Sequence, residues 1–244
     1  MIQVEGLHKR FGSVTAVDGV GFTAPDGAVT GLLGPNGAGK TTTLRMLYGL
    51  MRPDAGRIVV DGVDAVARPQ EAQGRLGVLP DVSGLYPRLT AREHIRYFGE
   101  LQGLSGEALR RREDELLARL DMAAIADRRT AGFSHGERTK VAIARALVHG
   151  PRNVLLDEPT NGLDVMSTRA VRDIIRRLRA EGHAVLFSSH VMQEVSALCD
   201  TIVVIARGRV VATGTPDDLR RQTGQADLED AFVALAGPSA EHAP

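Results

Sequence analysis

The sequence contains almost no cysteine or lysine, no tryptophan and no net charge. Its single cysteine, Cys199, excludes a disulfide within the chain and favours a reducing compartment. The 244 residues include 30 basic and 30 acidic ones, so no overall positive charge points to nucleic acid as a partner. Lysine occurs only at positions 9, 40 and 140, which makes Lys40 conspicuous among the arginines.

Long apolar runs are missing as well. No stretch approaches the roughly 20 apolar residues that a membrane-spanning helix needs, and residues 1–10 lack the apolar centre of a signal peptide. We therefore expect a soluble chain in the cytoplasm. Any place on the inner face of the plasma membrane would come through a partner protein.

Short apolar segments alternate with stretches of helical periodicity, which is typical of an α/β fold. Six of these segments read as strands: residues 29–33, 58–60, 76–79, 154–156, 184–187 and 202–205. Because they are nearly continuous in apolar residues, they predict a mostly parallel sheet that is covered on both faces. Residues 2–7 and 13–22 read as shorter strands with glycine-rich turns, which predicts an antiparallel flank.

The pattern becomes helical between residues 85 and 150. A capping-box pattern, T-x-x-E, begins at Thr90 and opens one helix. Residues 106–120 and 137–149 continue at helical spacing, and no convincing strand interrupts them. The middle third of the chain is therefore expected to be a helical insertion in the α/β core.

A glycine-rich loop lies between the predicted strand at 29–33 and a predicted helix at 42–50. Glycines let backbone N–H groups converge on a phosphate, and the helix N-terminus adds the positive end of its dipole. Lys40 would reach the β- and γ-phosphates, and the Thr41 hydroxyl would ligate Mg²⁺. The strand and the helix on either side distinguish this loop from a glycine-rich turn with an accidental lysine. The loop matches the pattern G-x-x-x-x-G-K-[ST] of ATP-binding P-loops at every position: Gly34, Pro35, Asn36, Gly37, Ala38, Gly39, Lys40 and Thr41, with Thr42 next.

Two acidic residues, Asp157 and Glu158, end the apolar segment that starts at Asn153. Burying charged side chains costs free energy, so we do not expect a buried strand to end in two acids unless the acids have a function. In P-loop proteins the first acid holds Mg²⁺, and a following glutamate can act as the general base that positions the attacking water. We therefore assign Asp157 to the metal and Glu158 to the water. The alternative is an acidic cap of the next helix.

The segment 133–147 narrows the class of P-loop protein. It begins F-S-H-G-E and stands shortly before the strand that carries Asp157. It resembles the signature motif of ATP-binding cassette (ABC) ATPases, and this resemblance covers essentially the whole chain. It implies that Ser134 and Gly136 contact the γ-phosphate bound to a second subunit, so that two ATPs lie between two chains. A serine beside a glycine at a helix start offers a hydroxyl and N–H groups to phosphate, whereas read alone it is a helix N-cap.

Three further positions match the family. Phe11 stands where the family stacks an aromatic ring on adenine, with burial in the core as the alternative. Asp164 ends the segment N-G-L-D, which looks like the D-loop that crosses the dimer interface. His190 follows the predicted strand at 184–187 and resembles the switch histidine, which hydrogen-bonds the γ-phosphate. The resemblance thus adds Phe11 and Asp164 to the nucleotide-binding residues and His190 to the catalytic ones.

Two places depart from the commonest family pattern. Asp81 stands where the family has a glutamine, so it keeps an oxygen for the metal, adds a charge and loses an amide donor. We therefore predict that Asp81 joins Thr41 and Asp157 as a metal ligand, with tighter Mg²⁺ binding.

The second departure lies in the signature, where His135 replaces the first of two usual glycines and Glu137 replaces a glutamine. The serine and the second glycine remain, so we expect a working signature.

The resemblance implies one ABC ATPase domain over residues 1–236. The expected fold is a P-loop NTPase core of the RecA-like kind, with a mainly parallel sheet, an antiparallel β flank and an inserted α-helical subdomain. The expected divisions are a core at 1–84 and 151–214, a helical subdomain at 85–150, a C-terminal helical segment at 215–236 and a flexible tail at 237–244.

Three segments, 84–90, 133–138 and 157–166, look similar to the sodium-export branch of ABC-2-type exporter ATPases. Residues 228–235 supply a counterpart of that family's C-terminal helix. The resemblance implies ATP hydrolysis with Mg²⁺ in a head-to-tail dimer, expected to be a homodimer, which drives a separate ABC-2-type membrane permease. Sodium export is the activity that this branch suggests, although selectivity would reside in the permease.

Two other classes of protein compete with this interpretation. ABC ATPases that act in translation carry two cassettes in one chain, and those that organise chromosomes carry long coiled coils. Neither fits within 244 residues. A P-loop kinase would have no use for the signature and D-loop segments. The sequence therefore favours a transport ATPase.

Overall fold

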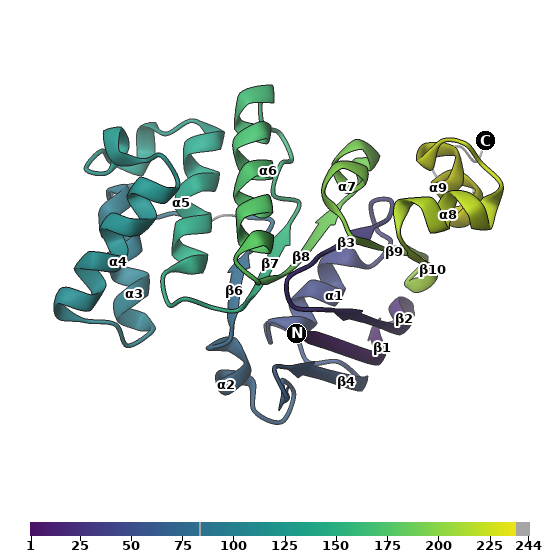
Figure 1. Ribbon diagram of the computed structural model, residues 1–244. Helices are drawn as coiled ribbons and strands as arrows, with labels where there is room; N and C mark the ends of the chain where they lie inside the picture. The colour runs from purple at the N-terminus through teal and green to yellow at the C-terminus, as the bar shows by residue number, and fades with distance from the viewer. Residues whose placement is uncertain (83, 238–244) are drawn as a thin grey trace.

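Two β-sheets form the framework of the chain, with helices on both sides of the larger one (Figure 1). The computed structural model describes residues 1–82 and 84–237. All but the first residue of the tail expected at 237–244 lies outside the described residues.

The larger sheet has six strands in the order β10-β9-β3-β8-β7-β6. Neighbouring strands pair in parallel, except that β10 runs antiparallel to β9. Side chains alternate between the faces, so Val154 and Leu156 enter one core and Leu155 enters the other. Burial of both faces explains the unbroken apolar runs, and the predicted parallel sheet is confirmed. The strands are β3 (Val29–Leu33), β6 (Leu76–Leu79), β7 (Asn153–Asp157), β8 (Ala184–Ser189), β9 (Thr201–Ala206) and β10 (Arg209–Gly214).

The smaller sheet is antiparallel, in the order β2-β1-β4-β5, which confirms the predicted flank. The prediction that residues 58–60 belong to the parallel sheet is wrong, because they pair with β1. Asp61 (φ 47°) and Gly62 (φ 81°) take left-handed conformations, as a two-residue hairpin turn requires, so the chain returns at once. The strands are β1 (Ile2–Phe11), β2 (Val14–Ala24), β4 (Ala55–Val60) and β5 (Val63–Asp64).

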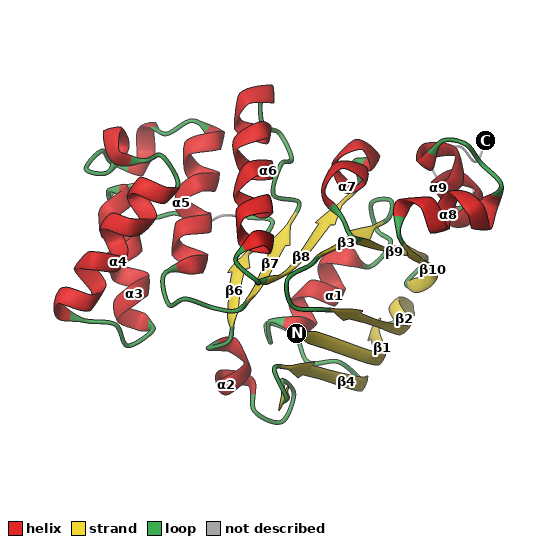
Figure 2. Cartoon of the chain, viewed as in Figure 1, coloured by secondary structure: helices red, strands yellow, loops and turns green. Residues whose placement is uncertain are grey.

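Two groups of helices lie at the two ends of the larger sheet, and α1, α6 and α7 lie along it between them (Figure 2). Helices α3, α4 and α5 form a group beside β6, and α8 and α9 lie near β10 at the opposite end. From α3 to α5 the chain forms no strand, only an isolated bridge between Thr90 and Arg129, which confirms the helical insertion. The helices are α1 (Lys40–Leu47), α2 (Pro69–Gln73), α3 (Ala91–Leu101), α4 (Gly106–Arg119), α5 (His135–Leu147), α6 (Val165–Ala180), α7 (Met192–Leu198), α8 (Pro216–Thr223) and α9 (Leu228–Ala236).

The helix boundaries agree with local sequence signals. Thr90, Ser134 and Thr215 each accept a hydrogen bond from the backbone of the third helical residue, whose acidic side chain bonds back to the cap. The helix predicted at 42–50 begins at Lys40 and ends at Leu47. None of the helices in the described ranges is both long and apolar enough to cross a bilayer.

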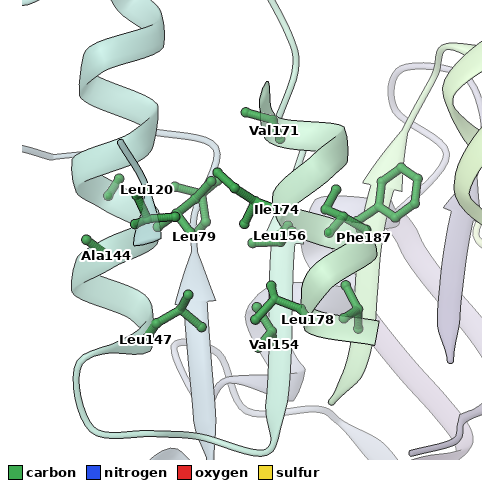
Figure 3. Packing of buried hydrophobic residues seen from close by; sticks show 14 of the residues in the cluster. Leu79, Leu120, Ala144, Leu147, Val154, Leu156, Val171, Ile174, Leu178 and Phe187 are labelled. Carbon is green, nitrogen blue, oxygen red and sulfur yellow. The ribbon is translucent and has the colours of Figure 1, made fainter. Parts of the chain in front are cut away.

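One apolar layer holds β7 and β8 in place beneath α5 and α6 (Figure 3). Because β7 ends at Asp157 and β8 ends at Ser189, this packing positions the polar residues at the ends of both strands. The labelled side chains include Ala144 and Leu147 of α5, Ile174 and Leu178 of α6, Val154 and Leu156 of β7, and Phe187 of β8.

Phe187→Ala is expected to lower the free energy of unfolding by about 3–5 kcal/mol, because this ring is fully buried and its removal leaves a cavity. Chemical denaturation without nucleotide measures the change. The exposed Val233→Ala is the control and is expected to change it by less than about 0.5 kcal/mol. A loss at Phe187 no larger than that of the control would contradict the packing.

Candidate active site

The glycine-rich loop joins the end of β3 to the start of α1 and passes very close to other parts of the backbone. A Cβ at Gly34 would lie 2.3 Å from the carbonyl oxygen of Ile205, and one at Gly39 would lie 2.5 Å from that of Ala16. Gly39 also has a φ of 104°, which a residue with a side chain rarely adopts. The loop therefore needs glycine at both positions to keep its shape.

Lys40 is held inside this loop. Its side chain is only 6% exposed, and its Nζ donates to the carbonyl oxygens of Gly34 (2.8 Å) and Pro35 (3.3 Å). The same nitrogen lies 3.4 Å from Oε1 of Glu158. The cation thus points at the loop and at the end of β7, where a phosphate could replace the carbonyls as its partner.

Asp157 is buried at the end of β7. Its Oδ1 accepts hydrogen bonds from Ser188 Oγ (2.5 Å) and Thr41 Oγ1 (3.3 Å), while its buried Oδ2 has no partner among the described residues. Burial raises the pKa of Asp157, the nearby Asp81 raises it further, and the two hydroxyls oppose the rise. An unpartnered carboxylate oxygen beside a threonine hydroxyl fits the oxygen ligands that Mg²⁺ prefers.

Within the described residues, no group of three or more His, Cys, Asp or Glu side chains could hold a metal ion.

Glu158 and His190 face each other at the ends of two neighbouring strands. The Nδ1 of His190 lies 2.9 Å from Oε2 of Glu158, and the backbone N–H of Glu158 donates to Ser188 Oγ (3.0 Å). Glu158 has a φ of 48°, a left-handed conformation that is uncommon for a residue with a side chain and is often found at functional sites. Ser188 therefore contacts both acids, a role that the sequence reading missed.

These residues surround one cleft of about 450 Å³. The cleft brings together the loop from Asn36 to Thr42, Asp81, Glu158 and His190, all of which the sequence singled out as candidate site residues. Asp157 lies behind the cleft, bonded to Thr41. Asn161 and Ala16 also line it and were not predicted as site residues. Asn161 belongs to the N-G-L-D segment and could have been found there, whereas the sequence gives no signal for Ala16.

Six predicted nucleotide-binding residues do not line this cleft. Two of them begin the loop itself, Gly34 and Pro35, and the other four lie elsewhere: Phe11, Ser134, Gly136 and Asp164. Ser134 caps α5, where its Oγ accepts from the N–H of Glu137 (3.2 Å), and Asp164 caps α6 in the same way. Gly136 packs against α6, since a Cβ there would lie 2.2 Å from Ser167 Oγ.

Phe11 ends β1 with its side chain about half exposed, so it is not part of the core. Lys9 places its Nζ 5.9 Å from the centre of the ring. The alternative of a buried aromatic is therefore wrong, and the ring is free to stack on a planar ligand.

Comparison with known proteins agrees with this geometry. A family model described as "ABC transporter" matches residues 17–161, which is more than half of the chain. The chain belongs to the ABC transporter family. The resemblance found in the sequence and the predicted ABC ATPase fold are both confirmed. The chain is an ABC ATPase, which binds ATP and hydrolyses it to drive transport.

Relatives within the ABC transporter family match over most of their length. The chain is 44% identical to the "ABC transporter ATP-binding protein NatA" of Bacillus subtilis, covering 96% of this chain and 97% of the relative. It is 40% identical to the "Nod factor export ATP-binding protein I" of Ralstonia nicotianae, covering 90% of this chain and 68% of the relative. A solved structure, an ATP-binding subunit of an ABC transporter, is 32% identical with a TM-score of 0.88, covering 97% of this chain and 100% of that one.

Proposed function

We propose that the chain is the ATPase subunit of an exporter, working as a homodimer that closes head to tail around two ATPs. It acts in the cytoplasm, docked on a separate ABC-2-type permease at the inner face of the plasma membrane. The observation that carries the proposal is the division of the predicted site: the P-loop, Glu158 and His190 share a cleft, whereas Ser134 does not line it.

The residues of the cleft divide the work of ATP hydrolysis. The loop from Gly34 to Thr42 and Lys40 bind the phosphates, and Lys40 exchanges its carbonyl partners for phosphate oxygens. Glu158 accepts a proton from the attacking water, and His190 orients the γ-phosphate by a hydrogen bond. Phe11, which is exposed at the end of β1 and outside the lining of the cleft, would stack on the adenine ring.

Mg²⁺ would be held by Thr41, Asp157 and Asp81. When bound, the ion neutralises charge that develops on the phosphates. The unpartnered Oδ2 of Asp157 is the oxygen that such an ion would satisfy. Protonation of Asp157 would compete with the ion, and because the pKa of this acid is raised, the competition begins at a higher pH than for an ordinary aspartate.

The residues that lie outside the cleft support a dimer. Ser134 is exposed at the start of α5, where a helix N-terminus and a hydroxyl can bind an anion. Ser134 and Asp164 cap exposed helix starts and do not line the cleft of their own chain, so we place these helix starts against the nucleotide of a second one. A head-to-tail pair completes both sites by the same contacts, as a two-fold symmetric homodimer requires.

Export is the direction that the relatives favour. One relative is named for the export of Nod factor, and the sequence segments that resemble exporter ATPases include the cleft residues Glu158 and Asn161. Sodium export rests on the sequence resemblance alone. Co-purification with a membrane protein of about six spans, followed by ATP-dependent flux in vesicles, tests this assignment. Binding to ribosomes without any membrane partner would contradict it.

Asp81→Gln is expected to change the Mg²⁺ dependence of hydrolysis. The substitution removes a negative charge near Asp157, so half-maximal activity is expected to need about two to ten times more Mg²⁺. A Mg²⁺ titration at saturating ATP measures the shift. Asp173→Asn, on the exposed face of α6, is the control. A titration that is unchanged by Asp81→Gln removes this residue from the ligands of the ion.

A further inference from the structure

Glu194 is a buried carboxylate to which the proposed reaction gives no role. It lies in α7 and is 5% exposed. Its Oε2 accepts a hydrogen bond from the hydroxyl of Thr160, and its Oε1 lies 3.6 Å from a guanidinium nitrogen of Arg172 in α6. A buried acid is stable only when it is paired and hydrogen-bonded, and Glu194 is both.

The two residues joined by this hydrogen bond belong to the two segments that carry the catalytic side chains. Thr160 follows Glu158 by two positions, in a turn where the N–H of Asn161 donates to the carbonyl oxygen of Glu158 (3.1 Å). Glu194 follows His190 by four positions, in the helix that begins directly after the loop from β8. The Thr160–Glu194 bond thus ties the loop after β7 to the helix after β8.

A direct contact also joins these segments, but it lies in the cleft. His190 Nδ1 and Glu158 Oε2 are 2.9 Å apart, and both residues line the space that ATP would occupy. A γ-phosphate and an attacking water that bind between these side chains take over their hydrogen bonds. The Thr160–Glu194 bond lies outside the lining of the cleft and is buried, so it persists when the direct contact opens.

We propose that Glu194 and Thr160 are positioning residues, which keep Glu158 and His190 at a fixed separation while ATP and water lie between them. The proposal rests on the proposed roles of Glu158 and His190. Arg172 places its guanidinium 3.6 Å from the other carboxylate oxygen and so helps to hold Glu194 next to Thr160. Neither residue touches substrate, so their loss acts on the rate of the chemical step and leaves ATP binding in place.

Thr160→Val tests this, because valine has the shape of threonine and lacks the hydroxyl. We expect kcat for ATP hydrolysis to fall about tenfold to a hundredfold, since small misplacement of catalytic groups has effects of that size. The KM for ATP and the affinity for ATP in the absence of Mg²⁺ are expected to change less than about twofold, because the P-loop is untouched. Thr160→Ser restores the hydroxyl and is expected to restore kcat.

Thr130→Val is the matched control, because Thr130 is another buried threonine whose hydroxyl makes one hydrogen bond, to the carbonyl oxygen of Tyr86. It is expected to lower stability and to leave kcat per folded protein unchanged. Glu194→Gln keeps an oxygen that accepts from Thr160 and is expected to reduce kcat less than Glu194→Ala.

Equal kcat values for wild type and Thr160→Val, or equal losses for the serine and valine variants, would overturn the positioning role. A fall in kcat for Thr130→Val as large as that for Thr160→Val would also overturn it. A different result would contradict the proposed catalytic roles of Glu158 and His190. In that case Glu158→Gln or His190→Ala would hydrolyse ATP at the wild-type rate.

Discussion

Glu158→Gln is expected to lower kcat for ATP hydrolysis by a factor of about 100 or more while ATP still binds. Glutamine has the shape of glutamate and can keep a hydrogen bond to His190, but it cannot accept the proton of the attacking water. Hydrolysis stops after ATP has closed the two subunits, so a dimer accumulates. Phosphate release measures the rate, and light scattering with Mg²⁺ and ATP measures the mass of the particle.

The control for this variant is Glu181→Gln. Glu181 is an exposed acid after α6 that pairs with Arg119 and lies outside the cleft lining. It is expected to hydrolyse ATP at the wild-type rate and to show no trapped dimer. If Glu158→Gln behaves like this control, another group activates the water.

Lys40→Ala is expected to weaken ATP binding at least about thirtyfold, or roughly 2 kcal/mol, because a buried cation that meets phosphate charge is lost. The carbonyl oxygens of Gly34 and Pro35 would then face the phosphates without a cation between them. Calorimetric titration with ATP measures the affinity, and hydrolysis is expected to disappear at ordinary ATP concentrations.

Lys140→Ala is the matched control, because it makes the same substitution at one of the two other lysines of the chain. Its Nζ lies 3.4 Å from the carbonyl oxygen of Asp121, and it does not line the cleft. Its loss is expected to leave the ATP affinity within about twofold of wild type, since an exposed contact of this kind contributes little. Equal affinities for the two variants would contradict the phosphate role of Lys40.

The positions of the P-loop and of the proposed catalytic pair could be predicted because they follow from local rules. A strand, a glycine-rich loop and a helix are contiguous in sequence, so Lys40 lies at the helix start wherever that unit is placed. Asp157 and His190 come at or just after the carboxyl ends of strands that prove to be parallel neighbours, with Asp157 opposite Ser188 in the register. Parallel strands bring such ends to one edge, where ligands bind.

Other features depend on pairing and packing that a single sequence does not reveal. The apolar run at 58–60 looks like the parallel strands, but it pairs with β1 in the antiparallel sheet, and the left-handed turn at Asp61 and Gly62 then returns the chain as β5. The strand β10 was missed for a similar reason, since a left-handed Arg207 (φ 51°) and Gly208 (φ 77°) turn the chain back from β9.

The tie between Thr160 and Glu194 is also invisible in the sequence. The two residues are 34 positions apart, and they meet only because α7 packs beside the loop after β7. The contacts of Ser188 are equally invisible in the sequence. Its hydroxyl donates a hydrogen bond to Asp157 and accepts one from the backbone N–H of Glu158. Hydroxyl-bearing residues near strand ends are common, so spacing alone could not single these out.

Cross-linking between two chains tests the head-to-tail dimer most directly. Two chains are prepared in the Glu158→Gln background with Cys199→Ala, one with Asn36→Cys in the P-loop and one with His135→Cys beside the signature serine. Both new positions are exposed in the single chain. The chains are mixed with Mg²⁺ and ATP and treated with a short bifunctional thiol reagent.

The proposed dimer predicts a covalent pair that contains one chain of each kind and that forms only with ATP. A single chain carrying both cysteines is expected to form no internal link when it is too dilute to dimerise. An internal link in that chain, with no covalent pair in the mixture while ATP still binds, would contradict the head-to-tail arrangement.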